Sequence, residues 1–118
     1  MRINVRELVG AVAITADDGQ KMYNLIYPAM LDGQTVDADF AGVTVVAPPF
    51  LNVAFGRLLQ DTSLDAIHCQ MRFPNLTPEG AATLQLVIEH AARYYSDPHV
   101  RAAVERALDD YREEAEAR

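Results

Sequence analysis

Alternation between apolar and polar residues predicts the first strands of the chain. Residues Ile3–Leu8 alternate in this way, which is typical of a half-buried strand. A second short strand is predicted at Val12–Ile14. The stretch Val36–Phe40 alternates again, and we expect Asp37 and Asp39 to lie on its solvated face.

The middle of the chain joins strands to a helix through two prolines. Val43–Val46 is a continuous apolar run, as expected for a strand covered on both faces. Pro48-Pro49 then disfavours helix upstream and presets the first turn of a helix over Phe50–Leu59. Alternation returns at Ile67–Phe73, which predicts a further strand with one buried face.

Helical spacing of apolar residues predicts three more helices, each with a start signal. Thr15 is expected to cap the first, and Thr77 the second, which runs to about Tyr95. Ser96-Asp97-Pro98 begins the third. An apolar stripe recurs along one face of this last helix, at Val100, Val104, Ala107, Leu108 and Tyr111. Strands alternating with helices indicate an α/β fold.

Composition limits the function classes that remain open. The chain has 118 residues and a formal net charge of −7, which repels the phosphates of nucleic acids and the surface of anionic membranes. Its longest apolar stretch, Gly42–Phe55, is too short to span a bilayer. The length predicts one domain. Because Cys69 is the single cysteine and the first residues lack a signal-peptide pattern, we expect a cytoplasmic protein.

Candidate catalytic groups do not form a workable constellation in the sequence. His68 and Cys69 are neighbours on a predicted strand, so their side chains point to opposite faces, and Cys69 is expected in the core. The histidines, including His90 and His99, lack the spacing of metal ligands, and the glycines form no phosphate-binding loop. We therefore expect no enzyme activity, no metal and no cofactor.

Five segments resemble the STAS-like family of small bacterial proteins. They occur in the family's order and cover Arg2–Tyr95; the most specific is PFLNVAFGRL. The segments are RINVRELVG, ITADDGQKMYNLI, VDADFAGVTVV, PPFLNVAFGRLL and FPNLTPEGAATLQLVIEHAARYY. The resemblance implies a small mixed β-sheet flanked by α-helices over residues 1–95. Residues 96–118 would add an extra C-terminal amphipathic helix outside the resemblance.

The resemblance also implies a regulatory protein–protein interaction module, similar to the antagonists of anti-sigma factors. In those proteins a Ser or Thr at the start of a helix after a central strand is phosphorylated. Ala47 and Pro48 occupy the matching positions here and cannot accept a phosphate, and Thr44 is the nearest hydroxyl. The implied partner is a kinase-like ATPase or a sigma regulator. We expect it to bind at Ala47, Pro48, Pro49, Phe50 and Asn52, with Thr44 and Arg57 near the rim.

Other interpretations stay open at this point. Pro48 and Pro49 are equally suited to starting a helix whose Phe50 lies in the core. A module that binds a small ligand, such as a nucleotide or a lipid, is an alternative function, although the two prolines remove two N–H donors from the helix start. A structural homo-oligomer is another, because the stripe on the last helix could be buried on its own domain or in a homodimer, and we prefer the homodimer.

Overall fold

The structure is a computed structural model that describes residues 1–116, with side chains described for residues 1–99 and 102–110. Its elements in chain order are β1 (Arg2–Asn4), α1 (Val5–Val9), β2 (Val12–Ala13), α2 (Ala16–Leu31), β3 (Val36–Asp39), β4 (Val45–Val46), α3 (Pro48–Ala54), the 3₁₀ helix η1 (Gly56–Gln60), α4 (Leu64–Gln70), β5 (Met71–Arg72), α5 (Pro78–Ser96) and α6 (Pro98–Glu116).

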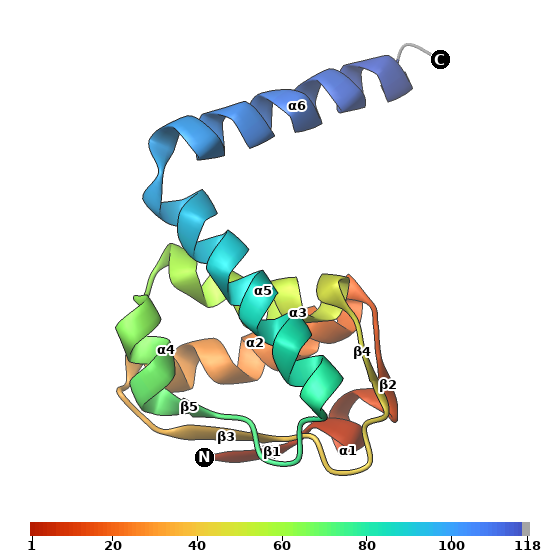
Figure 1. Cartoon of the computed structure of the whole chain (residues 1–118), viewed down its shortest axis with the longest axis vertical. Helices are drawn as coiled ribbons and strands as arrows, with labels where there is room; N and C mark the ends of the chain where they lie inside the picture. The colour runs from red at the N-terminus through yellow and green to blue at the C-terminus, as the bar shows by residue number, and fades with distance from the viewer. Residues whose placement is uncertain (117–118) are drawn as a thin grey trace.

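Two small parallel sheets organise the domain. β3 lies between β1 and β5 in the larger sheet, and β2 pairs with β4 in the smaller one. Figure 1 shows α2, α3 and α5 together on one side of the larger sheet. Ile3 lies beside Ala38, and Val36 beside Met71, and all four are buried under these helices. The α/β class is confirmed, with parallel pairing where we expected a mixed sheet.

The predicted helix starts are confirmed where the signal is local. The hydroxyl oxygen of Thr15 accepts a hydrogen bond from the Asp18 N–H at 3.1 Å, and that of Thr77 accepts one from the Gly80 N–H at 3.0 Å. Each bond satisfies one of the amides that a helix leaves unpaired at its first turn. Capping therefore fixes where α2 and α5 begin.

Two predicted strands are wrong over most of their length. Of the first, predicted over Ile3–Leu8, only Ile3 and Asn4 lie in a strand, because the Asn4 side chain accepts a hydrogen bond from the Glu7 N–H and starts α1. In the second, Ser63 accepts one from the Ala66 N–H at 3.1 Å and starts α4, which leaves Met71–Arg72 as the strand β5. In both places a side-chain cap converts an alternating segment into a short helix.

Aromatic rings form the centre of the core, which α3 and η1 complete. Phe55 is fully buried, and its ring centroid lies 5.2 Å from that of Phe73 and 6.4 Å from those of Phe40 and Phe50. The ring pairs are tilted or edge to face, which are favourable arrangements for aromatic contacts. Phe55 also marks a break in the backbone. The single helix predicted over Phe50–Leu59 is wrong, because the chain forms two helices, α3 and η1, joined at Phe55.

The C-terminal helix α6 stands apart from these layers. Figure 1 shows it turning away from the end of α5 and extending beyond the rest of the domain. Val104 is 39% exposed and Leu108 55%, and Ala107 is exposed as well, so burial of this stripe on its own domain is wrong. The side chains of Val100 and Tyr111 lie outside the described residues.

In the described part of the chain, no helix has the length and hydropathy needed to cross a membrane.

Candidate functional site

The junction between β4 and α3 is rigid and lacks a hydroxyl group. Ala47 is extended at φ −112° and ψ 153°, and its N–H donates to the Ala13 carbonyl at 2.9 Å. Pro48 and Pro49 follow in the first turn of α3, where their rings fix the backbone. Because neither proline has an N–H, the helix start has lost two of the donors that would hold an anion.

Thr44 lies before β4, and its hydroxyl group is engaged by a neighbouring loop. Its Oγ1 donates to the carbonyl oxygen of Ala11 at 3.2 Å, and its backbone N–H donates to the same oxygen at 2.8 Å. The residue is exposed, but these two bonds hold it against the segment that leads into β2. Thr44 therefore fixes the register of β4 on β2.

Exposed apolar side chains on β2 and β4 precede the junction. Val12 is paired with Val45, and their exposed fractions are 45% and 46%. Ile14, which follows β2, is 42% exposed. The prediction that the strand at Val43–Val46 is covered on both faces is therefore wrong, since β4 pairs with β2 alone among the described strands and Val45 is exposed. We call Val12, Ile14, Val45, Pro48 and Pro49 the junction surface.

Two shallow grooves lie along α5, and the first of them begins at the prolines. The first, of about 420 Å³, is lined by Pro48, Pro49, Asn52, Val87 and His90. The second has a similar volume of about 420 Å³, shares Asn52 and His90 with the first, and reaches α6. Its remaining lining residues are Arg57, Ala91, Tyr94, Tyr95, Val104 and Leu108. We call this second groove the α5–α6 groove.

The structure separates the residues that we expected to bind a partner. Phe50 is fully buried in the aromatic core, which removes it from the surface. Arg57 is half-buried on η1: its guanidinium lies 4.6 Å from the centre of the Tyr23 ring and its Nη1 donates to Gln20 Oε1 at 2.7 Å. It is held against α2 and reaches the α5–α6 groove, not the rim of the junction.

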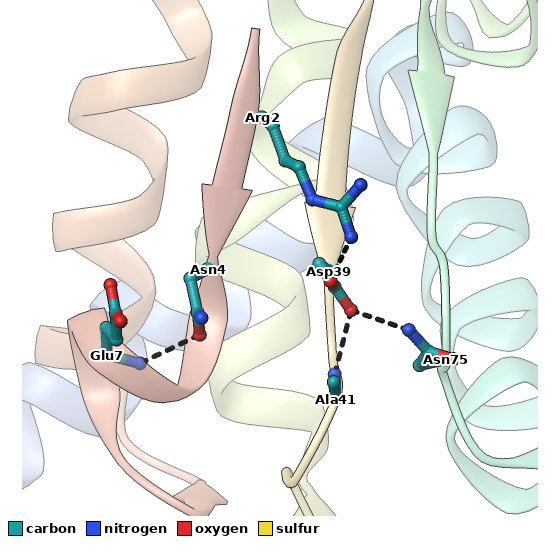
Figure 2. A network of polar contacts seen from close by, with 6 residues as sticks. All are labelled: Arg2, Asn4, Glu7, Asp39, Ala41 and Asn75. Atoms are coloured by element: carbon teal, nitrogen blue, oxygen red, sulfur yellow. Dashed lines mark hydrogen bonds and ion pairs between the residues drawn. The ribbon is translucent and has the colours of Figure 1, made fainter.

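Asp39 forms a polar network at the carboxyl end of the larger sheet. Figure 2 shows Arg2, Ala41 and Asn75 converging on its carboxylate. The Asn75 Nδ2 and the Ala41 N–H each donate to Oδ1 at 2.9 Å, while Arg2 pairs with Oδ2. Asp39 is 8% exposed, so the expectation of a solvated position is wrong. The residue ties together the ends of β1, β3 and the loop after β5.

Hydrogen bonding to this carboxylate decides what it can do chemically. The amide of Asn75, then the backbone N–H of Ala41, then Arg2 hold the pKa of Asp39 at about 2, below its ordinary value of 3.8. A carboxylate of such low basicity, with both oxygens bonded, is a poor general base. Its contribution is to the stability of the loops around the sheet.

We expect the stabilising effect of Asp39 to disappear in acid. Because the pKa is lowered in the folded state, the effect is fully present above the unfolded-state value and is lost as the pH falls toward about 2. Asp39→Asn should lower the denaturant midpoint of unfolding at neutral pH, and the gap to the natural protein should narrow between about pH 5 and about pH 2. Asp32→Asn, at the exposed end of α2, serves as control; a pH-independent gap for Asp39→Asn would contradict this origin.

Other candidate catalytic groups lie apart on exposed helices. His68 and Cys69 are neighbours on α4 and both side chains are exposed, so the placement of Cys69 in the core is wrong. His90 lines the grooves beside α5, and His99 is exposed at the start of α6. Within the described part of the chain, no three His, Cys, Asp or Glu side chains lie together as a metal site would require.

Comparison with known proteins identifies the family. No curated protein and no solved structure matches the chain significantly. The family described as the STAS-like domain of unknown function (DUF4325) matches residues 18–81, more than half of the chain. The matched residues run from the first turn of α2 to the first turn of α5, so they include the β4–α3 junction and exclude α6. The chain therefore belongs to the family of the STAS-like domain of unknown function.

Proposed function

We propose that this chain is a non-enzymatic regulatory module that binds another protein through the junction surface. The observation that carries the proposal is the pairing of two exposed apolar side chains, Val12 and Val45, beside a helix start fixed by two prolines. Exposed apolar groups that lie together are typical of interaction sites. A rigid backbone loses little conformational entropy on binding, which favours affinity.

The chemistry of the described residues supports binding more than catalysis. Asp39, whose pKa is clearly lowered, is engaged in holding loops together, and the single cysteine lies exposed on α4. Neither group has the partner that nucleophilic or general-base catalysis needs. A function in binding requires none of these groups.

Regulation by phosphate at the junction is not part of this proposal. By resemblance to the anti-sigma factor antagonists, Ala47 and Pro48 occupy the positions at which those proteins carry a Ser or Thr, and neither has a hydroxyl group. The partner we propose is a kinase-like ATPase or a sigma regulator, by resemblance to the anti-sigma factor antagonists. Here the association would be constitutive, or controlled on the partner's side.

A charge placed in the junction surface should abolish binding. Val45→Glu leaves the core intact, because the side chain is half exposed, but it would bury a carboxylate against the partner. We expect the dissociation constant of the purified pair to rise at least about thirtyfold, the effect of a hot-spot residue. The partner is first identified by cross-linking in the native cell, and the affinity is then measured by titration calorimetry.

A matched control separates loss of the surface from loss of the fold. Leu31→Glu introduces the same charge at a side chain that is 59% exposed, at the far end of α2 from the junction. It should leave the dissociation constant unchanged. Equal binding by the natural protein and Val45→Glu would refute the junction surface as the docking site.

A further inference from the structure

α6 presents an apolar face that its own domain leaves uncovered. The helix begins where Asp97 Oδ1 accepts a hydrogen bond from the His99 N–H at 2.9 Å, and it packs mainly on the end of α5. Val104 and Leu108 remain 39% and 55% exposed on this face. Most of the stability of a helix in a protein comes from packing of its apolar face, so we expect this face to be covered by a further contact.

The surface next to this face has the opposite charge character to the chain as a whole. The α5–α6 groove is lined by Val104 and Leu108 together with Arg57, His90 and two tyrosines. Among the described residues that line it, none is acidic, although the chain has a formal charge of −7. The groove therefore fits an amphipathic segment whose polar side is negative.

The sequence of α6 supplies such a segment. Residues 98–106 carry two arginines and one acid, whereas residues 107–116 carry five acids and one arginine. Side by side in parallel, two copies of this helix would bring their acidic halves together, which is unfavourable. Antiparallel, each acidic half lies against the arginine-bearing half of the other copy and over its groove.

We propose that two copies of this chain form a dimer in which α6 packs antiparallel against α6 of the second copy. A two-fold interface must be self-complementary, and the charge gradient along α6 meets that condition. The exposed Ala107, which lies next to Val104 and Leu108 on this side of the helix, allows the two helices to approach closely. Centred near Arg106, the pair sets Val104 of one copy beside Leu108 of the other. The dimer forms without the partner protein, so it is tested independently of the proposed function.

The first test is the molar mass of the full chain. Light scattering coupled to size exclusion should give twice the monomer mass of 13.0 kDa at high micromolar concentration. Leu108→Glu should raise the dimer dissociation constant at least about tenfold, with an unchanged circular dichroism spectrum. Leu31→Glu, equally exposed but distant from α6, should remain dimeric. If the natural protein stays monomeric up to high micromolar concentration, the proposal is wrong whatever the variants show.

The second test is the orientation of the two helices. In a Cys69→Ser background, Val104→Cys and Leu108→Cys are prepared separately, one carrying a mass tag, and are mixed under mild oxidation. An antiparallel pair joins residue 104 of one copy to residue 108 of the other, so the mixed disulfide should predominate. Predominant 104–104 and 108–108 products would show a parallel pair and contradict the proposal. Cross-links that form only outside α6 would also contradict it.

Discussion

Replacing Phe55 by Ala should destabilise the domain more than any exposed substitution. Its ring is fully buried and contacts three other aromatic rings, from β3–β4, α3 and the loop after β5. Truncating a buried Phe costs about 3–5 kcal/mol through lost transfer energy and the cavity left behind. Domains of this size are stable by only about 5–15 kcal/mol, so much of the total would be lost. Chemical denaturation followed by circular dichroism measures the change.

The control for this prediction is an apolar residue of similar chemistry outside the core. Leu86 is 55% exposed on α5, and Leu86→Ala should change the free energy of unfolding by less than about 0.5 kcal/mol. Comparable losses for the two variants would mean that Phe55 is not the centre of the core. Phe55 also joins α3 to η1, so its replacement should also disturb the packing of these two helices, which follow the junction.

Helix starts were predictable because their signals are local. Thr15 and Thr77 each accept a bond from an amide three residues ahead, and nothing remote in the chain competes with that contact. The strand predicted over Ile67–Phe73 was wrong for a related reason. The Ser63 cap starts α4 ahead of this segment, so the helix runs on to Gln70 and only Met71 and Arg72 are in a strand. Alternation alone does not decide between helix and strand in so short a segment.

Some features of the candidate site were predictable from the sequence and others were not. The prolines of the junction were predicted, because Pro at the start of a helix has a strong local preference. The exposure of Val12 and Val45 was missed, because an apolar run gives no information on which strands cover it. The burial of Asp39 was also missed, since Arg2 and Asn75 lie 37 and 36 residues away in the chain.

Adding a single methyl group at Gly19 should push α2 and α3 apart. A Cβ there would lie 2.6 Å from the Phe50 carbonyl oxygen and 3.0 Å from the Val53 Cβ. The closest atom belongs to the backbone, so no side-chain rotation relieves the contact and α3 itself must move. We expect Gly19→Ala to destabilise by about 1–3 kcal/mol, despite the gain of up to about 1 kcal/mol that Ala brings to a helix. Denaturant unfolding measures the balance.

The movement of α3 should also reach the junction surface, since Pro48 and Pro49 form the first turn of that helix. Binding of the partner should therefore weaken in Gly19→Ala even where the protein remains folded. Gly80→Ala is the matched control: it also lies in the first turn of a helix, but its Cβ would meet the end of the Leu76 side chain at 2.8 Å, which can rotate away. If Gly19→Ala proved as stable as the natural protein and bound equally well, α2 and α3 would not be in the close contact that positions the prolines.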